Sequence, residues 1–222
     1  MSVLQYEEER YLPDALLNYL VRLGWSHGDQ EVFTREEMIA AFDIHDVNKA
    51  ASAFNPEKLL WLNQQHMVRA EPAALVPHLR AQLHRLGIDS DDQKLLEGVI
   101  VTQRERAKTL KEMAQNSRFF FIDSVEIDPK AAAKHLAGDA AQVLTKVRVQ
   151  LASLPEWTAA AIHMALNDLA ASLQSGLGKI AQPVRVAVTG TAVSPPIDAT
   201  LALLGRERSL ARLDAALAQT SA

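Results

Sequence analysis

The stretch Pro72-Ala-Ala-Leu-Val-Pro-His-Leu-Arg-Ala-Gln-Leu-His-Arg-Leu-Gly87 repeats leucine at intervals of three or four residues. That spacing puts the leucines on one face of a helix. Pro72 suits a first helical turn, where its missing N–H is not needed, and Gly87 is a typical helix stop. The stretch therefore predicts an amphipathic helix. We place a domain boundary at its start, which gives domains over residues 1–70 and 71–222.

Helix start signals recur on both sides of this stretch. Before it, Asn55 can cap a helix with Pro56 in the first position, and Thr34 with Glu37 forms a capping-box pattern. After it, the acidic run at 89–92 suits the positive end of a helix. We expect further helices over 129–152, 155–174 and 201–217. Residues 182–188 alternate like a strand but could equally be a short buried helix.

The composition favours helices throughout. The chain has 222 residues and is 48% hydrophobic but only 5% aromatic, with 9 Gly and 9 Pro. This balance argues against a β-sandwich or barrel and predicts an all-α fold. Cysteine is absent, which excludes disulfides, thiolate zinc sites and a cysteine nucleophile. Trp25 and Trp61 are expected in the core rather than at the surface as stacking platforms.

The sequence contains no motif for catalysis, metal binding or nucleotide binding. Its seven histidines form no HxxxH or HExxH pair, and no GxxxxGK[ST], GxGxxG or GxSxG occurs. We therefore expect no catalytic, cofactor or metal residue. Residues 1–25 carry four acids, which is unlike a signal peptide, and no apolar run reaches the length of a membrane span. The expected location is the cytoplasm, with no membrane contact.

Charge is distributed unevenly. The net charge is −4, yet residues 101–118 hold five bases against two acids, and residues 179–212 hold the same numbers. Residues 1–50 instead hold ten acids against four bases. We call 101–118 the first basic island and 179–212 the second. Such islands indicate either an anionic partner or ordinary solvated helix faces.

Four stretches carry a resemblance to a known family. They are Tyr11-Leu-Pro-Asp-Ala-Leu-Leu-Asn-Tyr-Leu-Val-Arg-Leu-Gly-Trp-Ser-His-Gly28, Asn48-Lys-Ala-Ala-Ser-Ala-Phe-Asn-Pro-Glu-Lys-Leu-Leu-Trp-Leu-Asn63, Gln182-Pro-Val-Arg-Val-Ala-Val-Thr-Gly190 and Leu201-Ala-Leu-Leu-Gly-Arg-Glu-Arg208. Together they resemble bacterial glutamyl-tRNA synthetases, in the order that the family has them. The family's HIGH and KMSKS-type signatures are missing, so the resemblance implies a C-terminal fragment without the catalytic domain.

The resemblance implies a stem-contact helical domain over 1–70, lying against the inner corner of the tRNA, and a helical-cage anticodon-binding domain over 71–222. The implied partner is glutamate tRNA, bound by a monomer. ATP and Mg²⁺ would serve the parent ligase and not this fragment, which is expected to be inactive alone. The alternative function is a helical protein-interaction module without RNA binding, using the acidic N-terminal face.

The resemblance also assigns residues to the anticodon. Arg106, with Arg104 beside it, matches an arginine that reads the third anticodon base, which is C in glutamate tRNA. An arginine fork can hydrogen-bond an unpaired base edge bidentately. Solvated helix-end arginines remain the structural alternative.

Arg185 matches an arginine that contacts the first anticodon base, and the alternative is a half-buried arginine that ties the core together. Ser194, Pro195 and Ile197 match the loop that lines the same pocket, although Pro196 departs from the family's pattern. Other basic residues are generic phosphate candidates, of which fewer than half are expected to make contact: Lys108, Lys111, Arg118, Arg206, Arg208 and Arg212. In the stem-contact part, Lys49 and Lys58 could also meet phosphate.

Overall fold

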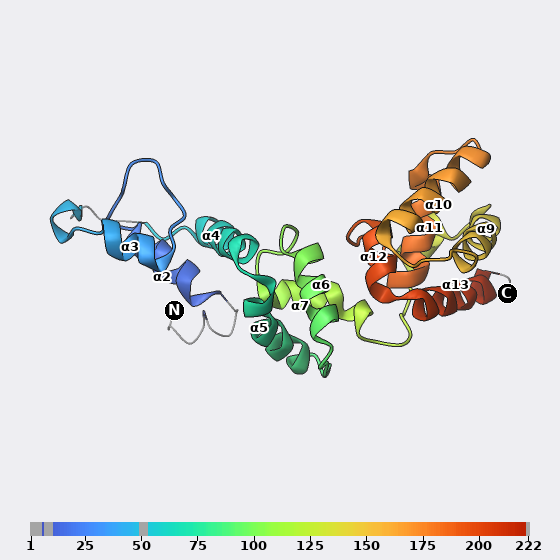
Figure 1. Ribbon diagram of the computed structural model, residues 1–222, viewed down its shortest axis with the longest axis horizontal. Coiled ribbons are helices and arrows are strands. Elements are labelled where there is room, and N and C mark those ends of the chain that lie inside the picture. Colours follow the sequence, from blue (N-terminus) through green and yellow to red (C-terminus); the bar gives the residue numbers. More distant parts are fainter. Residues whose placement is uncertain (1–5, 7–10, 49–52, 221–222) are drawn as a thin grey trace. The chain divides into compact units, whose positions relative to one another are not determined.

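The computed structural model describes residues 6, 11–48 and 53–220, and these residues contain helices and no β-strand (Figure 1). The predicted all-α fold is confirmed. The α-helices are α2 (Pro13–Val21), α3 (Arg35–Ala41), α4 (Pro56–Arg69), α5 (Pro72–Arg85), α6 (Gln93–Gln103), α7 (Leu110–Ser117), α8 (Pro129–His135), α9 (Ala140–Ala152), α10 (Ala159–Ser172), α11 (Leu177–Thr189), α12 (Ile197–Leu204) and α13 (Arg206–Thr220). Short 3₁₀ turns lie at Ile44–Asp46 and Arg118–Phe120.

The chain divides into two compact units, Met1–Gln115 (unit 1) and Asn116–Ala222 (unit 2). Each unit is described by itself. The boundary that we place between residues 70 and 71 falls inside unit 1. The division by contacts does not test that domain boundary, which stays a prediction.

Unit 1 contains the helices whose start signals are clearest in the sequence. Asn55 accepts a hydrogen bond from the backbone N–H of Lys58 at the start of α4, and both halves of the capping box at Thr34 are present. α5 packs against α6, and its leucines at 79 and 83 are fully buried. Trp25 is buried as expected, whereas Trp61 is 41% exposed on α4, so the expectation of a core position for Trp61 is wrong.

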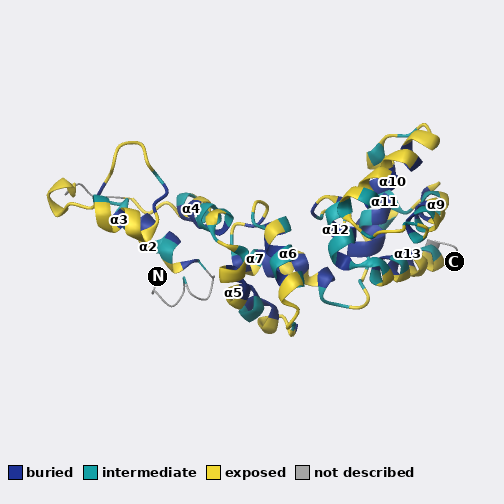
Figure 2. Ribbon diagram, viewed as in Figure 1, coloured by how far each residue is buried: buried dark blue, intermediate teal, exposed yellow. Residues whose placement is uncertain are grey.

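Unit 2 is built around α11. This helix contacts α8, α9, α10, α12 and α13, and most of its residues are buried (Figure 2). The stretch 182–188 is therefore helical, which decides between the two alternatives left open by its alternating pattern. The helix ends at Gly190, whose φ is 79° and where a Cβ would collide with the carbonyl oxygen of Glu126.

Two helices expected to be continuous are interrupted. The region 129–152 forms α8 and α9, and the region 201–217 is shared by α12 and α13, which are separated at Gly205. Gly205 has a φ of 87°, a positive value that favours glycine and that ends α12 before α13 begins.

Candidate nucleic-acid interface

Most of the first basic island lies in the loop between α6 and α7, residues 104–109, and in α7 itself. The Arg106 side chain is exposed, while its backbone N–H donates to the carbonyl of Gln103 at 2.8 Å. The N–H of Ala107 donates to the same carbonyl at 2.9 Å, and the Ala107 side chain is fully buried. The loop backbone is thus fixed while the guanidinium of Arg106 faces solvent.

Helix α4 holds this loop through side chains. The Asn63 Nδ2 donates to the carbonyl of Lys108 at 2.6 Å, and the Gln64 Nε2 donates to the carbonyl of Glu105 at 2.8 Å. Arg104 is half-buried and its Nη1 donates to the carbonyl of Ala70, the C-cap of α4, at 3.4 Å. Arg104 therefore anchors the loop, whereas Arg106 and Lys108 extend from it.

The end of the loop caps the next helix. Thr109 Oγ1 accepts from the N–H of Glu112 at 3.1 Å, and Glu112 Oε2 accepts from the N–H of Lys108 at 2.7 Å. The first bond satisfies an amide in the first turn of α7, which helix geometry leaves without a partner, and the second ties the preceding loop to the helix. Lys111 and Arg118 follow in exposed positions.

The predicted residues of the second island lie at the junction of α11 and α12. Arg185 Nε donates to Ser194 Oγ at 2.9 Å, and Ser194 Oγ donates to the carbonyl of Pro195 at 2.8 Å. Arg185 and Ser194 are half-buried, Pro195 is buried, and Ile197 is 6% exposed. Arg185 and Ser194 thus form a fixed polar pair, and Ile197 belongs to the core.

Three other arginines of this island bind backbone carbonyls. Arg212 is 4% exposed and donates to the carbonyls of Phe119, Ile122, Asp123 and Val188. Burial, followed by the charge of Arg208, lowers the pKa of Arg212 to about 10, so it remains protonated at neutral pH.

Arg208 donates to the carbonyl of Phe120 at 2.6 Å. Arg206 donates to the carbonyl of Leu154 at 2.5 Å and lies over the ring of Trp157, 5.4 Å from its centroid. Arg206, Arg208 and Arg212, which the sequence offers as phosphate candidates, thus donate hydrogen bonds to backbone carbonyls of unit 2.

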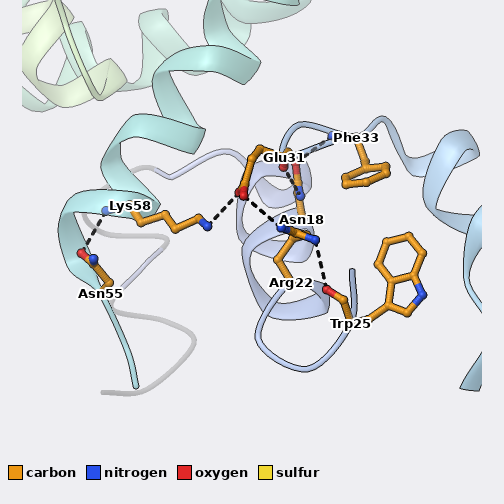
Figure 3. A network of polar contacts seen from close by, with 7 residues as sticks. All are labelled: Asn18, Arg22, Trp25, Glu31, Phe33, Asn55 and Lys58. Carbon is orange, nitrogen blue, oxygen red and sulfur yellow. Dashed lines mark hydrogen bonds and ion pairs between the residues drawn. The ribbon is translucent and has the colours of Figure 1, made fainter. Parts of the chain in front are cut away.

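In the acidic part of unit 1, Lys58 belongs to an ion-pair network (Figure 3). Its Nζ lies 2.7 Å from Glu31 Oε2, and Arg22 Nη2 donates to Glu31 Oε1 at 2.9 Å. The hydrogen bond from Lys58 and the adjacent Arg22 keep the pKa of Glu31 below its usual value. Lys58 is therefore paired within the protein, and Lys49 lies outside the described residues.

Unit 2 also contains a basic hollow that the sequence does not predict. It has a volume of about 590 Å³ and its lining includes Lys134, Lys146, Lys179 and His135, with one acid, Asp139. Its charge and concave shape suit an anion. The lysines come from α8, α9 and α11, so no charge run signals them; Lys179 alone falls in a basic island.

The described part of the chain has no cluster of three or more His, Asp or Glu side chains poised to hold a metal ion. Among the same residues, no helix has the length and apolarity needed to cross a bilayer. The residues described above are arginines, lysines and hydroxyls, which are groups that contact RNA bases and phosphates.

Comparison with protein families gives two matches. Residues 70–217 match the family described as "Anticodon binding domain". Residues 1–61 match the family described as "tRNA synthetases class I (E and Q), catalytic domain".

Individual proteins agree with these matches. The chain is 56% identical over 217 residues to glutamate–tRNA ligase 1 of Alkalilimnicola ehrlichii, covering 98% of this chain and 46% of that protein. It is 52% identical to glutamate–tRNA ligase 2 of Coxiella burnetii strain Dugway, with the same coverage. Among solved structures, the glutamate tRNA ligase of Elizabethkingia meningosepticum matches with a TM-score of 0.86 and 29% identity, over 96% of this chain and 42% of that one. The chain thus spans slightly under half the length of the proteins it resembles.

Proposed function

Because this chain belongs to the anticodon-binding-domain family and is 52–56% identical to glutamate–tRNA ligases over slightly under half of their length, we propose that it binds glutamate tRNA and reads its anticodon. The observation that carries the proposal is the loop 104–109, which presents an exposed Arg106 on an anchored backbone. A fixed loop favours selective recognition, because less conformational freedom is lost when RNA binds.

In this proposal Arg106 reads the third anticodon base. Cytosine offers acceptors at O2 and N3, and the planar guanidinium can donate two parallel hydrogen bonds to them. Lys108, exposed on the same loop, would meet a phosphate. Arg104 would act indirectly, since its Nη1 is bonded to the Ala70 carbonyl.

Arg185 and Ser194 would contact the first anticodon base. The hydrogen bond between them orients the guanidinium, and an oriented guanidinium plane is suited to stacking on a splayed base. Pro195 would shape the site through its backbone, whose carbonyl accepts from both Ser194 and Thr200. Ile197 would support the site from the core.

The activity of the whole ligase is likewise proposed. The whole ligase would attach glutamate to tRNA in the cytoplasm. The ATP and Mg²⁺ for this reaction would bind to the portion of the ligase that this chain does not match. The 222-residue chain would bind tRNA as a monomer without forming an aminoacyl-adenylate.

A mobility-shift titration with glutamate tRNA tests the proposal. We expect retention at low salt that weakens steeply as salt rises, because contacts to phosphates release counterions. An unrelated tRNA of equal length serves as the control and should bind more weakly. No retention at low salt would contradict RNA binding and favour a protein-interaction module.

A further inference from the structure

We propose that Asn63 and Gln64 are positioning residues, which hold the loop 104–109 from α4 and thereby fix where Arg106 stands. The inference rests on the proposed reading role of Arg106. It goes further by assigning part of base selectivity to side chains that need not touch RNA.

Asn63 is the central anchor. Its side chain is fully buried, with Nδ2 donating to the Lys108 carbonyl at 2.6 Å and Oδ1 accepting from the Leu12 N–H at 2.7 Å. Exchanging the amide's oxygen and nitrogen would oppose donor to donor and acceptor to acceptor, so the two partners define its orientation. The residue thus ties the loop to α4 and to the segment before α2.

Gln64 provides a second anchor at the other side of Arg106. It donates to the carbonyl of Glu105, the residue before Arg106, whereas Asn63 holds a carbonyl two residues after it. Arg106 therefore lies between two backbone groups bonded to neighbouring residues of one helix. Two directional hydrogen bonds fix both the position and the orientation of the loop backbone relative to α4. Apolar burial of Ala107 alone would not fix its orientation.

This arrangement predicts a specific kind of defect. Loosening an anchor lets Arg106 sample other positions, which weakens a bidentate bond to a base because that bond needs correct geometry. Phosphate contacts tolerate such motion better, because a flexible cation can follow the backbone. Selectivity for the third base should therefore fall more than affinity for tRNA.

The test uses Gln64→Ala, with Gln65→Ala as the matched control on the same helix. The measured quantity is a ratio: the Kd for glutamate tRNA with G as the third anticodon base, divided by the Kd for the same tRNA with C there. Losing one hydrogen bond should lower this ratio by about three- to tenfold in Gln64→Ala, and Gln65→Ala should leave it unchanged. Combining Gln64→Ala with Arg106→Gln should add little, because both act on one contact.

A second measurement needs no RNA. Hydrogen exchange in the free chain should become faster at the amides of Arg106, Ala107 and Lys108 in Gln64→Ala, with the core of α5 unchanged. Asn63→Asp, which replaces the donor by a carboxylate oxygen, should give the same pattern more strongly. A thermal transition shows whether the Asn63→Asp variant has folded. If it has not, the hydrogen exchange of Gln64→Ala alone tests whether the loop is held from α4.

The outcomes separate the two proposals. An unaltered chain that prefers C, together with a Gln64→Ala variant that keeps this preference in full, would overturn the positioning role and leave the reading role standing. An unaltered chain without any preference would overturn the reading role of Arg106 and the inference that depends on it. Equal hydrogen exchange in the two chains would also contradict the anchoring role of Gln64.

Discussion

The two basic islands carry the same formal charge in the sequence but use it differently in the structure. In the first, the side chains of Arg106, Lys108, Lys111 and Arg118 are exposed, and Arg104 anchors the loop. In the second, Arg206, Arg208 and Arg212 donate to carbonyls of unit 2, and Arg185 is bonded to Ser194. Equal charge in sequence therefore does not mean equal availability to a partner.

The difference follows from the chemistry of arginine. A guanidinium has five donors and can satisfy several backbone carbonyls where chain segments meet without regular hydrogen bonding. Arg212 does this for the segment 119–123 and for the end of α11. The second island is mainly part of the fold, whereas the first remains accessible to phosphates and bases.

The largest expected effect comes from removing Arg212. Arg212→Leu leaves buried carbonyl groups without donors, so the free energy of unfolding of unit 2 should fall by roughly 3–5 kcal/mol. Lys111→Ala, in the first island, should change the free energy of unfolding of unit 1, where it lies, by less than about 0.5 kcal/mol. Urea denaturation followed by circular dichroism measures both. Similar losses for the two variants would break the distinction between the islands.

Arg106→Gln should have the next largest effect, on selectivity and not on stability. Its loss should lower the preference for C at the third anticodon position about tenfold, which corresponds to about 1.4 kcal/mol. The thermal transition should stay where it is because the side chain is exposed. Filter binding with tRNAs that differ only at this base measures the ratio, and an unchanged ratio would remove Arg106 from the site.

A smaller effect is expected in the salt dependence of tRNA binding. Lys108→Ala should reduce the slope of log Kd against log salt by about 0.7, the value for one phosphate on a single strand. Arg208→Gln should leave the slope unchanged, because Arg208 is bonded to the Phe120 carbonyl. If the slope fell in Arg208→Gln and not in Lys108→Ala, the second island and not the first would contact phosphate.

The smallest effect concerns acid stability in unit 1. His66 contacts Asn18 Oδ1 through Nε2 at 3.1 Å; burial lowers the pKa of His66, Asp14 opposes the shift and Arg69 adds to it. Protonation is thus disfavoured in the folded state. Neutral His66 should therefore contribute to the free energy of unfolding above the unfolded pKa of about 6.5. This contribution should be lost as pH falls through the lower pKa of the folded state. Denaturation midpoints measured from pH 7.5 to 5 should decline less in His66→Gln; parallel curves would exclude His66 as the cause.

Local signals in the sequence revealed much of the fold, and tertiary contacts explain what they missed. The caps at Thr34 and Asn55 lie within a few residues of the groups they bind, so short-range chemistry predicts them. The helical state of 182–188 instead depends on packing of α11 against helices elsewhere in unit 2. Likewise, the carbonyls bound by Arg208 and Arg212 are mostly far away along the chain.

For the candidate site, the sequence supplied residue types but not their environment. Charge counting found both islands, and the family resemblance selected Arg106 and Arg185. Neither could identify Asn63 and Gln64, since their partners lie more than 40 residues away and amides give no charge pattern. The lysines of the hollow in unit 2 were missed because three helices bring them together.

The central claim, that this chain reads the anticodon of glutamate tRNA, is tested most directly by its unaltered affinity for a matched pair of RNAs. Kd is measured at one fixed low salt concentration for glutamate tRNA and for the same tRNA with G in place of C at the third anticodon position. We predict tighter binding to the tRNA with C, by about tenfold. Equal affinities for the two tRNAs would contradict the claim.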